Sequence, residues 1–365
     1  MAPSQDRQVF TIHDIRVEAE NVLPQIYRQY YNDGAGDMST LLDNEKAYGR
    51  YKLRPRVLRN VKNVDTTTEI FGIKVSAPLG FAPAAAHKVA HPIGEIGTSR
   101  VASRRNIPMC LSTYSTTSLE DVITQGTENP YAMQVSFFNE AGVTESLIRR
   151  AEKAGYKALF VSVDLPVLGN RVSEKRNNFK FPSHLVFPNI HKESEDPMKH
   201  YGAGYDSTLT WETTIAWLRA STKMQIWLKG IVSPEDVQLA IDYGLDGVVI
   251  SNHGGRQLDG QLSTLDALRE CAPVARGKMP IVLDGGIRRG SDIFKAIALG
   301  AKMCFVGRIP IWGLAYNGEA GVEEAVDILL KEFRETMMHM GCRTIADITP
   351  KCLSLALENG VMARL

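Results

Sequence analysis

Short apolar runs recur along the chain, and each is followed by polar or glycine-rich residues and then by a segment of helical periodicity. Eight such runs occur, at residues 79–82, 109–112, 132–136, 158–163, 226–228, 248–250, 281–283 and 304–306. Between them, the pattern predicts helices over 145–154, 234–243, 265–271 and 290–299, with Gly155, Gly244 and Gly300 as stop signals. Continuous apolar runs of this length are typical of parallel strands buried on both faces. Eight alternating units predict an α/β fold, a closed (β/α)8 TIM barrel.

Two segments fall outside this alternation. Residues 1–75 contain a helical stretch at 15–31 and a glycine-rich turn at 32–36, and we expect this amino-terminal extension to pack on the barrel because no Pro/Ser-rich linker separates them. The connection from 169 to 212, after the fourth strand, is too long for an ordinary βα loop, and such loops often cover a site. We therefore expect a single domain over 1–365, with the extension at 1–75, the barrel at 76–345 and a carboxyl-terminal segment at 346–365.

Composition and charge narrow the possible partners. Of 365 residues, 44% are hydrophobic and 23% are charged, as in ordinary soluble proteins. Lys plus Arg, 42, nearly cancels Asp plus Glu, 41, so the net charge of +1 provides no basic field and argues against a nucleic-acid partner. No apolar run reaches the roughly 18 residues of a membrane span, and the amino terminus lacks the apolar core of a signal peptide. We expect an intracellular protein without a membrane span.

The cysteines and the chain end add two smaller expectations. The five cysteines are scattered, odd in number and never spaced as Cys-x-x-Cys, so neither a disulfide framework nor a metal site is expected. The final tripeptide, Ala363-Arg364-Leu365, has the small-basic-leucine form of the peroxisomal address Ser-Lys-Leu. The alternative is an ordinary chain end and a cytoplasmic location.

Polar residues of unusual chemistry cluster where the predicted strands end. Lys229 follows the fifth run, His253 the sixth, Asp284-Gly285-Gly286 the seventh and Gly307-Arg308 the eighth. In a TIM barrel the βα loops at the carboxyl ends of the strands present residues from several strands to one cavity. Unrelated polar loops would not favour strand ends in this way. We therefore expect the active site at this face.

The stretch 251–259 combines a candidate base with a candidate carboxylate-binding group. His253 can accept a proton near neutral pH, and Arg256, three residues later, can direct two donors onto a carboxylate. The pair suits chemistry at the α-carbon of an acid, although a polar loop with an incidental histidine is the alternative. Asp164 ends the fourth run, where a carboxylate beside His253 would raise its basicity and orient it. A helix-capping aspartate is the competing interpretation.

Glycine-bearing loops after the seventh and eighth strands favour a phosphate site. Glycines at 285, 286 and 307 let backbone N–H groups approach an anion, Arg288 and Arg308 carry the opposite charge, and a helix begins near Ser291. The alternative is a pair of tight turns capped by surface arginines. Lys229 at a strand end either stabilises negative charge on a reduced flavin or is a snorkelling structural lysine, and the residues alone do not decide between these.

Taken in order, these motifs resemble the FMN-dependent α-hydroxy-acid oxidase and dehydrogenase family, which includes glycolate oxidase and lactate oxidase. The similarity runs from about Tyr27 to the chain end. It implies FMN as cofactor, His253 as the base oriented by Asp164, Arg256 and Arg171 as the carboxylate-binding pair, and Tyr30 as a substrate-binding tyrosine. It also implies that a larger set holds the flavin, its ribityl chain and its phosphate: Pro83, Ala84, Ala85, Ser112, Gln134, Ser162, Lys229, Ser251, Asp284, Gly285, Gly286, Arg288, Gly307 and Arg308.

The sequence departs from the family pattern at the substrate. Ser136 stands where the family commonly has a tyrosine beside the substrate and flavin, and Tyr114 stands where glycolate oxidases have tryptophan. A serine at this position removes a donor and opens space. We therefore expect a substrate bulkier than glycolate.

The resemblance implies oxidation of an L-2-hydroxy acid to the 2-keto acid, with electrons passed to O₂ to give H₂O₂. One alternative is a dehydrogenase that delivers electrons to a cytochrome or quinone. Others are an FMN barrel with isomerase-type chemistry, a phosphate-ligand barrel without redox chemistry, and a flavin-binding relic recruited for interaction. The family also suggests a homotetramer.

Overall fold

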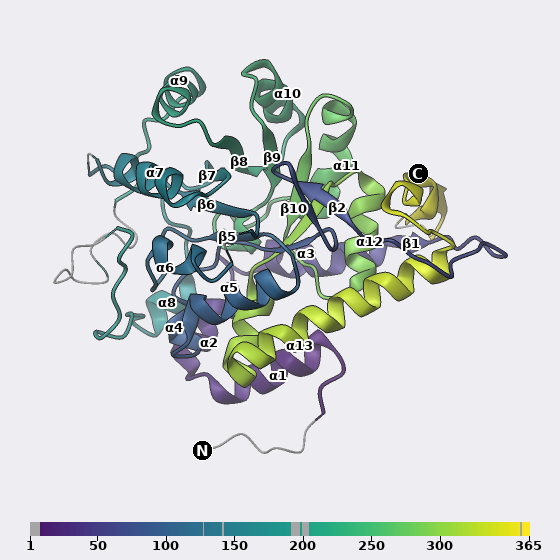
Figure 1. Cartoon of the computed structure of the whole chain (residues 1–365), viewed down its shortest axis with the longest axis horizontal. Coiled ribbons are helices and arrows are strands. Elements are labelled where there is room, and N and C mark those ends of the chain that lie inside the picture. Colours follow the sequence, from purple (N-terminus) through teal and green to yellow (C-terminus); the bar gives the residue numbers. More distant parts are fainter. Residues whose placement is uncertain (1–7, 127, 141, 191–197, 199–203, 358–359) are drawn as a thin grey trace.

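The computed structural model describes residues 8–126, 128–140, 142–190, 198, 204–357 and 360–365 (Figure 1). Within these residues, eight parallel strands close a barrel, and β11 pairs with β4 to complete the ring. The strands are β4 (Leu79–Phe81), β5 (Met109–Leu111), β6 (Tyr131–Val135), β7 (Ala158–Ser162), β8 (Gln225–Ile231), β9 (Gly247–Ile250), β10 (Ile281–Asp284) and β11 (Met303–Val306). Each coincides with a predicted run, so the (β/α)8 TIM barrel is confirmed.

Aromatic side chains fill the end of the barrel opposite the carboxyl ends of the strands. A hairpin of β2 (Thr68–Ile70) and β3 (Ile73–Val75) brings Phe71 against the inward-facing Phe160 and Trp227, at ring-centroid distances of 5.9 and 5.6 Å. All three rings are buried, and they belong to one apolar cluster with residues of the barrel interior. Because apolar packing closes this end, ligands have to enter from the other face.

Helices surround the barrel, as the alternation predicts (Figure 1). They are α4 (His87–Ala90), α5 (Gly94–Arg104), α6 (Leu119–Ile123), α7 (Val143–Ala154), α9 (Trp211–Ser221), α10 (Pro234–Asp242), α11 (Thr264–Ala275), α12 (Gly290–Leu299) and α13 (Arg308–Met340). The four predicted helices are confirmed as α7, α10, α11 and α12. Gly155 and Gly300 take the left-handed conformation just after α7 and α12, with φ of 101° and 116°, as expected of helix stop signals.

The amino-terminal extension differs from its prediction. A single helix over 15–31 is wrong, because the structure has α1 (Ile12–Val22) and α2 (Gln25–Asn32) separated at Leu23 and Pro24. Proline disfavours a helical conformation in the residue before it, and Leu23 is indeed extended, with ψ of 130°. α1 lies alongside α13, as Figure 1 shows, and α2 carries Tyr30 to the mouth of the barrel.

Hydrogen bonds join the end of the extension to the loops of the barrel. In the predicted turn at 32–36, the Ala35 N–H donates to the Gly255 carbonyl at 2.8 Å, and the Gly36 N–H donates to the Asn170 carbonyl at 2.9 Å. The carboxylate of Asp259 accepts bonds from the backbone that leads into α3 (Ser39–Arg50). The extension therefore braces the loops after β7 and β9.

The long connection after β7 contains α8 (Val172–Arg176) and a group of aromatic side chains. Phe179 stacks on Tyr30, with ring centroids 4.5 Å apart and planes 4° from parallel, and Phe181 packs against both rings. Residues 191–197 and 199–203, part of the predicted cover, lie outside the described residues. The described part of the connection lies against the mouth of the barrel.

The carboxyl-terminal segment returns to the extension. β1 (Tyr51–Leu53) pairs with β12 (Leu353–Ala356), which pairs with β13 (Met362–Arg364), all antiparallel. Short 3₁₀ turns, η2 (Ile345–Asp347) and η3 (Pro350–Cys352), precede this sheet, and η1 (His253–Gly255) follows β9. In the described part of the chain, no helix has the length and apolar character needed to cross a membrane.

Candidate active site

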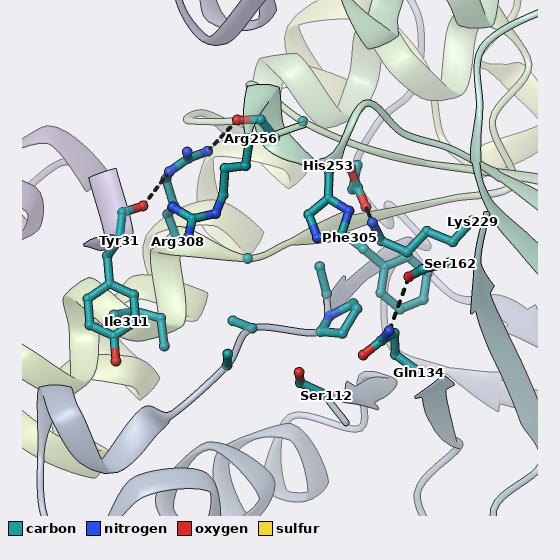
Figure 2. Close-up of a pocket in the computed structure, with 18 of the residues that line it drawn as sticks. Tyr31, Ser112, Gln134, Ser162, Lys229, His253, Arg256, Phe305, Arg308 and Ile311 are labelled. Atoms are coloured by element: carbon teal, nitrogen blue, oxygen red, sulfur yellow. Dashed lines mark hydrogen bonds and ion pairs between the residues drawn. The ribbon is translucent and has the colours of Figure 1, made fainter. Parts of the chain in front are cut away.

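A cavity opens at the carboxyl ends of the barrel strands and brings most of the predicted site residues together (Figure 2). Those that line it are Tyr30, Pro83, Ala84, Ala85, Ser112, Tyr114, Gln134, Ser136, Ser162, Arg171, Lys229, His253, Arg256, Asp284, Gly285, Gly286, Arg288, Gly307 and Arg308. Asp164 and Ser251 do not line the cavity and contact it through other residues. In Figure 2, Arg308 and Tyr31 lie at one end and Lys229 and Gln134 at the other.

His253 and Asp164 form a hydrogen-bonded pair at the ends of β9 and β7. The Nδ1–H of His253 donates to the Asp164 carboxylate at 3.1 Å, which leaves Nε2 for a group in the cavity. Gly230 makes the approach possible, because a Cβ on it would lie 2.6 Å from the Asp164 side chain. Asp164 therefore orients the imidazole and does not serve as a helix cap.

The two members of this pair have shifted pKa values. Burial lowers the pKa of His253 below its ordinary value, and Lys229 adds to this, while Asp164 opposes it. Burial alone would raise the pKa of Asp164, but His253 and Lys229 lower it by more. At neutral pH the pair is a neutral imidazole beside a carboxylate, which is the arrangement a proton acceptor needs.

Arg256, Arg171 and Tyr30 converge from three separate segments. The Arg256 guanidinium lies over the Tyr30 ring, 5.0 Å from its centroid, and donates to the backbone carbonyls of Tyr30 and Asp33. Arg171 Nε donates to the Arg256 carbonyl at 3.5 Å, and Glu174 forms ion pairs with both arginines. Burial raises the pKa of Tyr30 to about 12, so its phenol stays protonated and can donate. Two cations and one donor at the cavity wall suit a carboxylate.

Lys229 is a paired interior lysine and does not extend its ammonium to solvent, as a snorkelling lysine would. Its residue is 4% exposed, and its Nζ donates to Ser251 Oγ at 3.0 Å and lies 3.5 Å from Asp284 Oδ2. Burial would lower the pKa of Lys229, but Asp284 and Asp164 raise it by more, so the ammonium stays charged. Ser251 also donates to Asp284 at 2.7 Å and accepts from the His253 N–H. Ser251 thus supports the lysine and histidine from outside the cavity.

The glycine-bearing loops after β10 and β11 both line the cavity, where an anion site was expected. Gly286 has φ of 75°, and a Cβ on it would lie 1.9 Å from the Asn44 carbonyl oxygen, so only glycine fits this turn. Arg308 donates to backbone carbonyls of Tyr31 and Gly254, at 2.8 and 3.1 Å. Burial, with the nearby Arg256 and Arg288, lowers the pKa of Arg308 to about 9.

This site fits a phosphate. Among the described residues, nothing accepts a hydrogen bond from the buried Nε of Arg288, which lines the same cavity as Arg308. α12 begins at Gly290, close to these loops, and its amino-terminal end attracts negative charge. Because the arginines repel each other, a dianion between them would relieve an electrostatic cost. Surface arginines that cap tight turns do not account for this arrangement.

The remaining polar lining residues form a network at the strand ends. Gln134, on β6, donates from Nε2 to Ser136 Oγ at 3.0 Å. It also donates to Ser162 Oγ at 3.1 Å, as Figure 2 shows. Its Oε1 accepts from the Thr113 N–H at 3.0 Å, and Ser112 Oγ accepts from the Tyr114 N–H. The amide therefore has a fixed orientation toward the cavity. Pro83, Ala84 and Ala85 supply the small side chains of the adjoining wall.

Several lining residues escaped the sequence interpretation. The Tyr205 hydroxyl lies 3.2 Å from the Tyr114 hydroxyl, but Tyr205 belongs to the long connection, which shows no periodicity to signal it. The Tyr31 hydroxyl donates to the Ala86 carbonyl at 2.7 Å. The others are Ala82, Leu165, Leu168, Gly254, Ile287, Phe305, Val306 and Ile311. These are apolar or glycine residues, for which core packing and cavity lining look alike in a sequence.

Comparison with known proteins decides the family. The model of the FMN-dependent dehydrogenase family matches residues 19–355. The chain belongs to this family. The chain is 50% identical to an oxidase named FUB9 from Fusarium oxysporum f. sp. lycopersici, over 99% of this chain and 95% of that protein. It is 40% identical to the peroxisomal (S)-2-hydroxyacid oxidase GLO4 of Arabidopsis thaliana, over 94% of this chain and 95% of that protein.

Solved structures agree with this assignment. A mandelate oxidase variant with (S)-mandelic acid superposes on this chain with a TM-score of 0.89 at 33% identity, covering 96% of this chain and all of that one. The predicted family and FMN as cofactor are therefore confirmed. The predicted reaction class, FMN-dependent oxidation of a 2-hydroxy acid by an oxidase, is also confirmed.

Proposed function

We propose that this enzyme oxidises an (S)-2-hydroxy acid larger than glycolate to the 2-keto acid, with O₂ as the final acceptor and H₂O₂ as product. The observation that carries the proposal is the convergence on one cavity of the His253–Asp164 pair, the arginines Arg171 and Arg256, and the anion site. A non-redox phosphate barrel would have no use for a base and a carboxylate-binding pair together, and the similarity to oxidases argues against an isomerase, which could use both. A flavin-binding relic recruited for interaction would need neither the base nor the carboxylate-binding arginines.

Each residue has a defined task in this reaction. Arg171 and Arg256 bind the substrate carboxylate, and the protonated Tyr30 phenol adds a donor. His253 Nε2 accepts the proton released as the hydroxy acid becomes a keto acid, and the Asp164 carboxylate stabilises the resulting imidazolium. FMN supplies the two-electron acceptor for this oxidation. The Lys229 ammonium places a buried positive charge at the cavity wall, where negative charge would develop.

We propose that the cofactor lies along the lining residues expected from the sequence. Arg288, Arg308 and the glycine loops would hold the phosphate, because the Arg288 Nε has no acceptor among the described residues and the positive charge beside Arg308 fits an anion. Ser112, Gln134, Ser162 and Lys229 would hold the ring and the ribityl chain, because they are the polar groups that line the opposite end.

The size of the substrate follows from Ser136. Its hydroxyl accepts from Gln134 Nε2 and so lies against the polar network, and the short side chain leaves room for the group attached to the α-carbon. Solved mandelate oxidases, whose named ligand carries an aromatic ring, are similar to this chain. This similarity supports an aromatic or branched acid as substrate.

A steady-state comparison tests this proposal. The FMN-loaded enzyme should turn over (S)-mandelate or a branched 2-hydroxy acid with a higher kcat/KM than glycolate, and should form one H₂O₂ for each keto acid. Equal or higher efficiency with glycolate would contradict the substrate proposal. Fast dye reduction without peroxide would instead identify a dehydrogenase with a different acceptor.

We also propose three properties of the whole protein. The single domain divides into 1–75, 76–345 and 346–365. The chain forms a homotetramer, as the family resemblance suggests. The tripeptide Ala363-Arg364-Leu365 directs the protein to peroxisomes, and the similarity to a peroxisomal oxidase of Arabidopsis supports this. A fluorescent fusion with and without the last three residues tests the third property, since cytosolic signal from both would contradict it.

A further inference from the structure

Glu174 contacts both arginines of the proposed carboxylate site. Its Oε1 lies 3.6 Å from Arg171 Nη1 and 3.3 Å from Arg256 Nη2. The Glu174 side chain is 10% exposed, and it does not line the cavity. Glu174 lies in the first turn of α8, and Arg171, three residues earlier, is the residue that precedes this helix. One buried carboxylate oxygen of a residue outside the cavity lining is therefore shared by both guanidinium groups.

The two arginines have other hydrogen-bond acceptors that hold them in place. Arg256 donates to the carbonyls of Tyr30 and Asp33 and stacks on the Tyr30 ring. Arg171 donates to the Arg256 carbonyl and to Gln257 Oε1, both at 3.5 Å. These acceptors are neutral. What Glu174 adds to the set is negative charge, and charge acts on a bound carboxylate even without contact.

The charges of Glu174, Arg171 and Arg256 affect the pKa of a residue in the cavity wall. After burial, the largest influences on the pKa of Tyr30 are Arg256, which lowers it, Glu174, which raises it, and Arg171, which lowers it. Tyr30 lines the cavity, so the field of Glu174 reaches the surface that a substrate touches and opposes the field of the arginines there.

We infer that Glu174 determines charge specificity: it cancels one of the two positive charges of the Arg171–Arg256 pair, so that the site accepts a monocarboxylate and discriminates against dianions. The inference rests on the proposed function, because it assigns the carboxylate to this pair. Removing a charge changes the binding energy in proportion to the charge of the ligand. A dianion should therefore respond to the loss of Glu174 about twice as strongly, on a logarithmic scale, as a monoanion.

The test uses a Glu174→Gln variant of the FMN-loaded enzyme, because glutamine keeps the oxygen acceptor and removes the charge. Dissociation constants of oxalate, pyruvate and lactamide are measured by perturbation of the flavin absorbance. We expect pyruvate to bind about threefold more tightly to Glu174→Gln than to the wild type and oxalate about tenfold more tightly, because oxalate carries twice the charge. Lactamide, which is neutral, should bind equally to both.

The matched control variant removes the charge of a glutamate that does not line the cavity. Glu145→Gln breaks an exposed ion pair with Arg149 on α7 and should leave all three dissociation constants unchanged. If Glu174→Gln binds pyruvate and oxalate more weakly, Glu174 is only an anchor and the inference is wrong. Equal changes for all three ligands would also overturn it.

A second variant and a separate activity measurement allow every outcome to support or overturn the inference. Should Glu174→Gln fail to fold, Glu174→Ala must still raise the preference for oxalate over pyruvate, even if both bind less tightly, and an unchanged preference would overturn the inference. A wild-type enzyme that binds these anions but oxidises no 2-hydroxy acid would defeat the proposed function and leave the charge effect measurable.

Discussion

At the scale of single residues, the chemistry depends on a histidine whose pKa is lowered by burial and raised by one neighbour. His253 has to be neutral to accept a proton, and burial keeps its pKa below 6.5. The acid limb of the kcat/KM profile should therefore lie below pH 6.5. Asp164 holds Nδ1 and opposes the lowering, so it supports both the orientation of the ring and the stability of the imidazolium.

Replacing Asp164 by asparagine should reduce kcat by about 10²- to 10⁴-fold, because the imidazolium loses its counter-charge. The same change removes the group that raises the pKa of His253, so the acid limb should move to still lower pH. The pH dependence of kcat/KM measures both effects. Asp242→Asn, an exposed change on α10, is the control. An acid limb that moves to higher pH would contradict the assigned role.

Restoring a tyrosine at Ser136 should narrow the substrate range. We expect Ser136→Tyr to lower kcat/KM for (S)-mandelate by about tenfold or more, since a bulky group costs roughly 1–3 kcal/mol in a pocket that no longer fits it. Glycolate should be unaffected or turned over better, which makes it the internal control. Equal losses for both acids would show that the phenol disturbs the flavin and not the substrate.

Residues at strand ends could be predicted from sequence because a closed barrel brings the carboxyl ends of its strands together around one cavity. Lys229 and His253 each follow an apolar run, and the closed ring brings them to one cavity. Glu174 and Tyr205 had no such signal, since both lie in a connection without periodicity. Their roles depend on the path of a loop through space, which local patterns do not encode.

At the scale of elements, the amino-terminal extension braces the catalytic loop through Asp259. The Asp259 carboxylate accepts from the N–H groups of Asp37 and Thr40 and from the Ser39 hydroxyl, at 3.0, 2.8 and 2.8 Å. These bonds lower its pKa to about 2, although burial opposes them. A carboxylate in the loop after β9 thus caps the start of α3.

Asp259→Ala should lower the free energy of unfolding by about 1–3 kcal/mol at pH 7, because charge-assisted hydrogen bonds and a helix cap are lost. The folded pKa lies below the unfolded value of 3.8, so this contribution is present above pH 3.8 and is lost as the pH falls to about 2. Urea unfolding at several pH values tests this against Asp37→Ala, an exposed neighbour. If the difference in free energy of unfolding between Asp259→Ala and the wild type did not change with pH, the account would be contradicted.

The elements that were predicted correctly and the one that was not have a common explanation. Barrel strands and their helices are repeated, so each apolar run is interpreted in the context of the others. The break at Pro24 was missed because the apolar periodicity of 15–31 continues across it, although a proline inside a helical pattern indicates an end. At Pro24, the restriction that proline places on the preceding residue separates the two helices although the apolar periodicity continues.

At the scale of the whole molecule, neighbouring arginines carry an electrostatic cost that we expect the cofactor to relieve. Arg256, Arg288 and Arg308 lie close enough for Arg256 and Arg288 to lower the pKa of Arg308. An FMN phosphate held by Arg288 and Arg308 would offset the positive charge of these two residues. Holoenzyme stability should therefore exceed that of the apoprotein, and by a margin that depends on the free FMN concentration.

Arg308→Met separates folding from cofactor binding. The variant should bind FMN about tenfold to a hundredfold more weakly, the equivalent of losing a charge-assisted bond of roughly 1.5–3 kcal/mol. Its apoprotein should melt close to the wild-type apoprotein, because loss of a buried charge offsets the loss of hydrogen bonds to the Tyr31, Gly254 and Asp33 carbonyls. Fluorescence titration with FMN and thermal melts measure the two effects, with exposed Arg276→Met as control. A large drop in apoprotein melting temperature would contradict the account.

Anaerobic mixing of the FMN-loaded protein with (S)-2-hydroxy acids of graded size tests the central claim most directly. We predict loss of the oxidised flavin absorbance, faster with (S)-mandelate or a branched acid than with glycolate, and its near abolition in His253→Gln. Flavin absorbance that no 2-hydroxy acid changes, in wild-type protein shown to hold FMN, would contradict the claim that these residues form a hydroxy-acid oxidase site.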